Sequence, residues 1–142
     1  MKRLTLEVFT VLTMLAIVAG CAIERTQEQK VLSNIAVRNI VAQLIQRADN
    51  PAQRAELYAE RLNQGESTLT SGMNDSALIN LVSTVIGEKD LNQADQMLAR
   101  DIMELIPLYF KVPEGKIPPS AYEIAQDFIK QARFAVNLYL PK

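Results

Sequence analysis

Two carboxylates, Asp95 and Asp101, come closest in type and spacing to a catalytic pair. Glycoside hydrolysis needs two carboxyl groups roughly 5 to 9.5 Å apart across a cleft, and a metal-assisted reaction would also use paired acids. Helical periodicity places the two aspartates about 60° to either side of an apolar stripe and separates their backbones by about 9 Å along the helix. Because the two side chains diverge, we interpret them as boundary charges that pair with neighbouring helices.

Two like-charged pairs stand four residues apart, Glu56 with Glu60 and Glu123 with Asp127. Each pair is slightly unfavourable on one helix face, and a bound cation would explain it. Arginine and lysine residues nearby on the same segments explain the pairs equally well, because helix surfaces are ordinarily charged. We favour solvated faces over a metal site.

The composition removes most other catalytic devices. The 142 residues contain no His, which excludes a His-dependent triad, a His-containing zinc site and an unperturbed switch near neutral pH. The hydroxyls at positions 67, 68, 70 and 71 therefore have no imidazole base, and we interpret 66–74 as a connecting loop. We expect a protein that is not an enzyme, with no cofactor, no metal and no small-molecule substrate.

The charge and the length of the chain limit its functional class and its domain organisation. The chain carries 15 Lys+Arg against 16 Asp+Glu, with the basic residues scattered, so it lacks the electrostatic footprint of a nucleic-acid binder. Its length suits one globular domain. A single Cys excludes an internal disulfide, so the fold depends on its hydrophobic core.

The first twenty residues have the pattern of an export signal. Lys2 and Arg3 form a basic head, and the run from Val8 to Val18 is apolar apart from two threonines. An uncleaved membrane anchor is an alternative, but the 16 residues from Val8 to Ile23 fall short of the roughly 20 that span a bilayer. A further alternative treats Cys21 as a buried core residue.

The segment Val18-Ala19-Gly20-Cys21 closes this run with small residues directly before the cysteine. It resembles the bacterial lipoprotein signal, whose lipobox is a hydrophobic residue, two small residues and an invariant Cys. The resemblance implies that the Cys21 sulfur receives a diacylglycerol, that the bond between Gly20 and Cys21 is cut, and that the new amino terminus is acylated. Residues 1–20 would then be the signal peptide and the lipid bilayer the first partner.

The distance from the lipid to the domain is short. Residues 21–25 form the modified Cys and its tether, and the four residues after Cys21 reach at most about 14 Å. We therefore expect the domain to lie close to the membrane. Ala22 is not the Asp that, in this family, resembles an inner-membrane retention signal, so we expect the periplasmic face of the outer membrane. In a Gram-positive cell the same signal would mean the outer face of the only membrane.

Residues 26–142 predict an all-α domain, a compact bundle of about five helices. We expect capping boxes at Thr26/Gln29 and Ser120/Glu123, and starts at Asn50-Pro51, Asp75 and Asp90. Gly65 and Gly87 should end the second and third helices, and Pro107 should kink or end the fourth. The inward positions we expect are 37, 40, 41, 44, 45 and 48; 55, 58, 59 and 62; 78, 81, 82, 85 and 86; 91, 94, 98, 102, 105 and 109; and 122, 125, 129, 132, 136 and 139.

Two apolar residues of the last helix, Phe134 and Leu138, fall opposite its apolar stripe. We expect other helices of the bundle to cover both sides, since a last helix can dock centrally in an α-domain. The alternative is an interaction surface for a protein partner or the membrane.

The segment DNPAQRA at 49–55, with the helix end before it, is similar to small helical lipoproteins of tailed phages and prophages. We consider two candidate functions from different classes. One is a non-enzymatic envelope adaptor that contacts an envelope protein of unknown identity. The other is a pilotin-like chaperone whose apolar groove binds an amphipathic helix of a secretion-channel subunit. An enzyme acting on cell-wall glycan is a third.

Overall fold

The computed structural model describes residues 27–110, 112, 114–115 and 117–142. This part of the chain folds into five α-helices and one 3-10 turn and contains no strand, which confirms the predicted all-α bundle. The Thr26 cap lies outside the described residues. The elements are α2 Gln27–Gln46, α3 Pro51–Ser67, α4 Asp75–Ile86, η1 Glu88–Asp90, α5 Gln93–Phe110 and α6 Ala121–Asn137.

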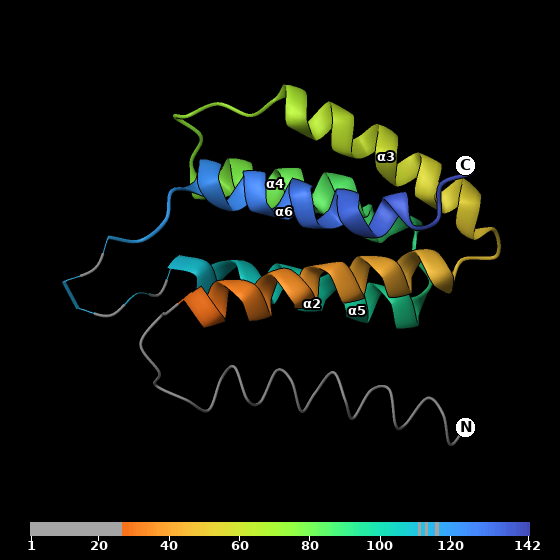
Figure 1. Ribbon diagram of the computed structural model, residues 1–142, viewed down its shortest axis with the longest axis horizontal. Helices are drawn as coiled ribbons and strands as arrows, with labels where there is room; N and C mark the ends of the chain where they lie inside the picture. Colours follow the sequence, from red (N-terminus) through yellow and green to blue (C-terminus); the bar gives the residue numbers. More distant parts are fainter. Residues whose placement is uncertain (1–26, 111, 113, 116) are drawn as a thin grey trace, which may run out of the picture.

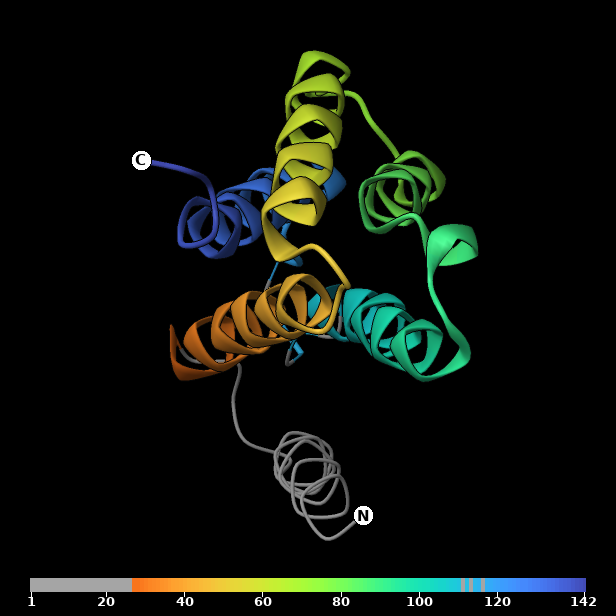
Figure 2. The same cartoon turned by 90° about the vertical axis from the view of Figure 1, so that its right-hand side faces the viewer.

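The helices surround one core. α2 and α5 form one layer, α4 and α6 lie above them, and α3 covers the top (Figure 1). The view along the bundle in Figure 2 separates the helices, with α6 and α4 on opposite sides and α2 and α5 beneath. α6 makes its main contacts with α2, α3 and α4, so it joins the two layers.

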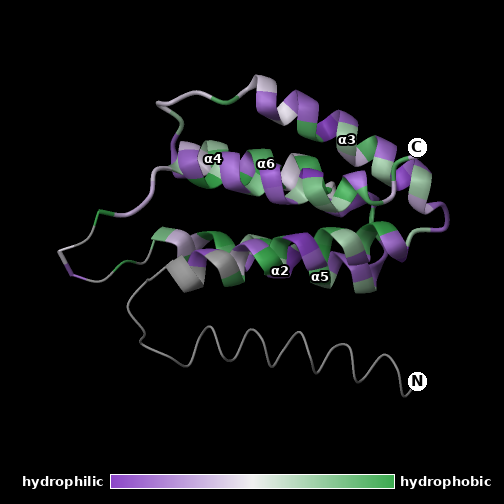
Figure 3. Ribbon diagram, in the orientation of Figure 1, coloured by the Kyte–Doolittle hydropathy of each residue, from purple (hydrophilic) through white to green (hydrophobic). Residues whose placement is uncertain are grey.

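The core is built from the apolar side of each helix. In Figure 3 every labelled helix carries both hydrophobic and hydrophilic segments, as expected of helices with one buried side. The predicted inward positions 78, 81, 82, 85 and 86 of α4 are all buried. The largest side chain among the fully buried residues is Tyr58. Its hydroxyl donates a hydrogen bond to the carbonyl of Ile86 over 3.2 Å, and burial raises the pKa of this hydroxyl.

Several helix ends follow the predicted local chemistry. Ser120 and Glu123 form both halves of the capping box of α6. The Asn50 side chain accepts from the backbone N–H of Gln53, and Pro51 occupies the first turn of α3. α4 ends at Gly87, which adopts the left-handed conformation at φ 62°.

Other predicted ends are wrong. α3 continues past Gly65 to Ser67, because its capping hydrogen bonds come from Thr68. The cap of α4 is Asn74 rather than Asp75, since the Asn74 side chain accepts from the N–H of Ala77. Asp90 lies in the 3-10 turn, and α5 starts later, at Gln93. Of the two effects expected of Pro107, a kink or an end, the end is excluded, because α5 runs on to Phe110.

The buried side of α5 also differs from the predicted stripe. Ala94 is exposed, whereas Asp95 and Ala99 are buried together with Ile102. Ala99, Ile102 and Ile106 recur at helical spacing, so burying them also turns Asp95 inward. There Asp95 forms an ion pair with Arg47, just after the end of α2. This pair joins the end of α2 to the start of α5, and the two helices run antiparallel (Figure 1).

Gly87→Ala is expected to destabilise the fold by about 2 kcal/mol or more. A left-handed conformation costs a residue with a Cβ about 1 to 2 kcal/mol. The added Cβ would also lie 1.9 Å from Nη1 of Arg61, which pairs with Asp90 and would have to move. Denaturant unfolding followed by circular dichroism measures the loss.

Gly72→Ala is the matched control, because a Cβ there would meet nothing within 4 Å and its φ is not positive. We expect the stability of this variant to stay within about 0.5 kcal/mol of the original. Equal losses for the two variants would contradict the role assigned to Gly87.

Candidate functional site

An exposed apolar surface lies on the second half of α6. Phe134 is 51% exposed and Leu138, just after the helix, is 67% exposed. The expectation that other helices cover both residues is therefore wrong. We call these two side chains, with Arg38 of α2 beside them, the α6 surface.

The sequence of α6 explains this position. Nine of its residues are buried, and they occupy the side that meets α2, α3 and α4. At 3.6 residues per turn, positions 134 and 138 fall on the other side of the helix. Among the described residues, no helix lies over that side to cover the Phe134 ring.

Arg38 holds the Phe134 ring in place. Its guanidinium carbon lies 4.3 Å from the ring centroid, a cation–π contact. Arg38 Nε also donates a hydrogen bond to Oε1 of Gln131, a side chain that is only 4% exposed. A buried amide on α6 thus orients an arginine on α2, and this arginine orients the aromatic ring. Sequence reasoning missed both Arg38 and Gln131; the one signal was a glutamine within an apolar segment.

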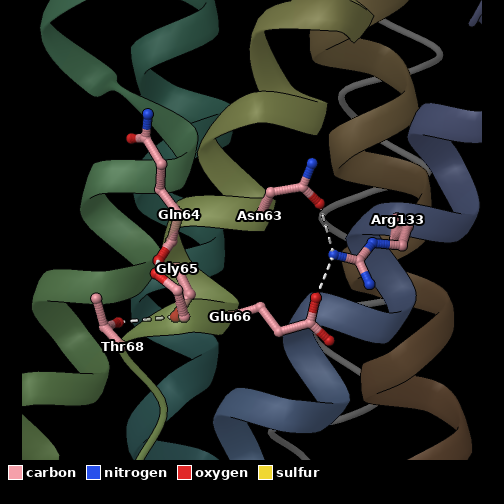
Figure 4. A network of polar contacts seen from close by, with 7 residues as sticks. Asn63, Gln64, Gly65, Glu66, Thr68 and Arg133 are labelled. Atoms are coloured by element: carbon pink, nitrogen blue, oxygen red, sulfur yellow. Dashed lines mark hydrogen bonds and ion pairs between the residues drawn. The ribbon is translucent and has the colours of Figure 1, made fainter.

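A shallow groove of about 450 Å³ adjoins the α6 surface, between α6 and the end of α3. Arg133 spans it, since its Nη2 donates to Oδ1 of Asn63 over 3.0 Å and to Oε2 of Glu66 over 2.7 Å (Figure 4). The guanidinium of Arg133 lowers the pKa of the Glu66 carboxyl. This ion pair therefore stabilises the fold above the ordinary Glu pKa and is lost as the pH falls through the lowered value.

The groove has a mixed lining, in which the apolar Leu69, Ile129 and Phe134 stand among charged and amide side chains. A second groove of about 500 Å³, along the start of α3, is mostly polar. The first is lined by Glu66, Leu69, Gln126, Ile129, Lys130, Arg133, Phe134 and Asn137, and the second by Ala48, Asp49, Asn50, Gln53, Arg54, Glu56, Leu57 and Glu60. Neither forms an apolar trough along a helix.

The structure gives the two aspartates different surroundings. Asp95 is 3% exposed. Its Oδ1 lies 3.0 Å from Nε of Arg47, which makes an ion pair without the alignment of a hydrogen bond. Its Oδ2 accepts a hydrogen bond from the side chain of Asn92. Asp101 is half-buried, and burial, followed by the charge of Glu104, raises the pKa of its carboxyl. The predicted pairing of Asp95 with a neighbouring element is confirmed, but Asp95 is buried rather than at the boundary of the apolar side.

The like-charged pairs have ordinary structural partners. Glu60 accepts from Gln64, and Asp127 pairs with Lys30 of α2 at 3.0 Å. Hydrogen bonds from Ser120 lower the pKa of Glu123, as expected for a capping carboxylate. In the part of the chain that the structure describes, no group of three or more acidic or Cys side chains is placed to hold a metal ion.

Two of the four hydroxyls predicted to lie in a connecting loop bind carbonyls at the end of α3. Ser67 donates to the carbonyl of Gln64 and Thr68 to that of Gly65, both local bonds that satisfy the last carbonyls of the helix. Residues 66 and 67 are helical, so the loop begins two residues later than predicted.

Gly20 and Cys21, the predicted cleavage and lipid-attachment residues, lie outside the described residues. Within the described ranges, no helix has the length and apolar character needed to cross a bilayer. Comparisons of the chain with protein-family models, with curated proteins and with solved structures gave no match.

Proposed function

We propose that the chain is a bacterial lipoprotein, anchored through acylated Cys21, whose helical domain is a non-enzymatic adaptor of the cell envelope. The segment Val18-Ala19-Gly20-Cys21 after an apolar run supports the anchor. The exposed Phe134 ring, held by Arg38, supports an adaptor that works through protein contact. Ordered aromatic and arginine side chains of this kind are typical of binding hot spots.

The grooves favour an adaptor over a pilotin-like chaperone. A chaperone that binds an amphipathic helix needs an apolar groove, because it must cover the apolar face of that helix. Neither groove of the described residues is apolar throughout: charged and amide side chains interrupt the first, an ion pair of Arg133 with Glu66 crosses it, and the second is mostly polar. The pilotin-like function remains the alternative.

The position of the α6 surface agrees with an adaptor on a membrane. Lys30 pairs with Asp127, and Arg38 contacts Gln131 and Phe134, so α2 and α6 run parallel. Phe134 stands thirteen residues after the start of α6, about 20 Å along the axis from the end where α2 begins. A partner at this surface would bind on the side of the domain away from the lipid.

The proposal includes a location in the cell envelope and a phage or prophage origin. Ala22 after the modified Cys favours the periplasmic face of the outer membrane, and DNPAQRA at 49–55 favours a phage or prophage origin. Lysis or tail genes beside the coding sequence would support this origin, whereas secretion genes would support the chaperone.

The double change Phe134→Ala and Leu138→Ala tests the adaptor function. Truncation of exposed side chains changes stability by about 0.5 kcal/mol, and an exposed cation–π contact adds about 0.5 to 1 kcal/mol. With two truncations we therefore expect a stability loss of at most about 2 kcal/mol, and loss of the envelope partner in affinity capture from membranes. Thermal melting and mass spectrometry of the captured proteins provide the two measurements.

Leu57→Ala with Met97→Ala is the matched control, because both residues are apolar, exposed by 37% and 65%, and on other helices. This control should keep both stability and capture. A loss of several kcal/mol in the α6 variant would place its side chains in the core, and retained capture would remove the proposed role of the surface.

A further inference from the structure

Ile117 is the most exposed large apolar side chain in the described part of the chain, at 93%. It lies in the loop between α5 and α6, outside any helix, and is followed by Pro118 and Pro119. Water is an unfavourable environment for this side chain, and none of the described residues covers it.

The backbone beside Ile117 is suited to an apolar surface. Proline has no N–H group, so two consecutive positions after Ile117 carry no backbone donor that would lose its hydration. An isoleucine next to two prolines can therefore leave water at a smaller desolvation cost than an ordinary loop segment.

The loop lies at the end of the bundle where α2 begins. The contacts of Lys30 with Asp127 and of Arg38 with Gln131 place the start of α2 beside the start of α6, and the loop leads directly into α6. Figure 1 shows the start of α2, the end of α5 and this loop together at one end of the molecule.

The short tether keeps this end of the bundle near the bilayer. Five residues, 22–26, separate Cys21 from Gln27, and they reach at most about 18 Å when fully extended. A lipid on Cys21 would thus hold the Ile117 end of the domain within this distance of the headgroups. The opposite end, which carries Met97 and Leu138, lies a further helix length away.

We propose that Ile117 and Pro118 insert into the headgroup region of the bilayer that holds the lipid on Cys21. This second contact rests on the proposed lipoprotein function and adds to it a fixed orientation of the domain. Two contacts at one end of the bundle, the acyl chains and the loop, direct the α6 surface away from the membrane.

A fluorescent probe at position 117 tests the insertion. The acylated full chain with Ile117→Cys, labelled with an environment-sensitive dye, is reconstituted into vesicles of phosphatidylethanolamine and phosphatidylglycerol. The Cys21 sulfur is then blocked by its lipid, so the new thiol is the only one labelled. We expect a blue-shifted emission and strong quenching by spin-labelled lipids. Met97→Cys, at an apolar residue that is 65% exposed at the far end, should show neither.

A second probe keeps Ile117 in place. With the dye at Glu114→Cys, an exposed position of the same loop, we expect quenching by the spin-labelled lipids, and Ile117→Asp should remove most of it. This pair of variants separates insertion driven by Ile117 from insertion driven by the dye.

Each other outcome overturns the inference. A probe at 117 that stays in water, or that is quenched no more than the one at 97, excludes the loop from the bilayer. A blue shift without lipid quenching would mean that a protein covers Ile117. Mass spectrometry of Cys21 separates the two proposals: an unmodified thiol overturns the lipoprotein function as well, whereas an acylated chain with a hydrated loop overturns only the insertion.

Discussion

Replacing Cys21 by serine is expected to abolish lipid labelling of the protein and to block its cleavage between Gly20 and Cys21. The resemblance to the lipoprotein signal implies a thioether between the cysteine sulfur and a diacylglycerol, and a serine hydroxyl is a far weaker nucleophile than a thiolate at neutral pH. Without acyl chains, each worth roughly 0.8 kcal/mol per buried methylene, stable anchoring should be lost. Labelling with a radioactive fatty acid and the size of the product on a gel measure both effects.

Ala22→Ser is the control for this experiment. It changes the neighbouring residue to a hydroxyl-bearing one while leaving the cysteine in place, so labelling and cleavage should continue. Normal labelling and processing of the Cys21→Ser chain would refute the lipoprotein proposal.

Arg47→Met is expected to lower the free energy of unfolding by about 3 kcal/mol. Removal of one partner of a buried ion pair leaves an uncompensated charge, which costs about 3 to 5 kcal/mol. The Asp95 side chain is only 4% exposed, whereas that of Arg47 is 35% exposed, so some water can reach the vacated site and the lower part of this range applies. Denaturant unfolding of the two chains measures the difference.

Arg100→Met provides a control matched in the distance of the ion pair. Nε of Arg100 lies 3.0 Å from Oε1 of Glu88, the same distance as in the pair of Arg47 with Asp95, but the two side chains are 65% and 36% exposed. An exposed pair contributes about 0 to 1 kcal/mol. A loss of similar size in both variants would contradict the importance of burial.

A double variant separates the buried charge from the packing of Arg47. Arg47→Met combined with Asp95→Leu removes both charges, and such replacement of a buried pair by apolar residues is often neutral or stabilising. We expect it to recover most of the stability that Arg47→Met loses. A double variant no more stable than Arg47→Met would show that the loss comes from packing rather than from the unpaired carboxylate.

Helix caps could be predicted from the sequence where the cap depends on neighbouring residues alone. The capping box of Ser120 with Glu123 and the left-handed Gly87 both involve groups within a few residues of one another. Asn74 and Asp75 show the limit of such prediction. Both side chains are of types that can accept from the backbone, and only the structure shows that Asn74 is the cap.

Periodicity predicted only part of the buried side of α5. Ile102 and Leu105 of the predicted stripe are buried, but Ala94 is exposed, and Ala99 and Asp95 face inward. Asp95 is accommodated there by an ion pair with Arg47, and no sequence pattern shows that residues 47 and 95 will meet.

The candidate site could likewise be predicted only in part. The sequence alone determined that Phe134 and Leu138 lie opposite the apolar stripe of α6, because the helical period fixes the side of the helix on which each residue lies. Only the tertiary structure decided that this side is open, since coverage depends on which helices pack against α6 and from which direction. It also decided that Arg38 reaches the Phe134 ring and that Gln131 holds Arg38, contacts between helices more than ninety residues apart in the chain. Such contacts arise from the packing of the whole core, which local periodicity does not encode.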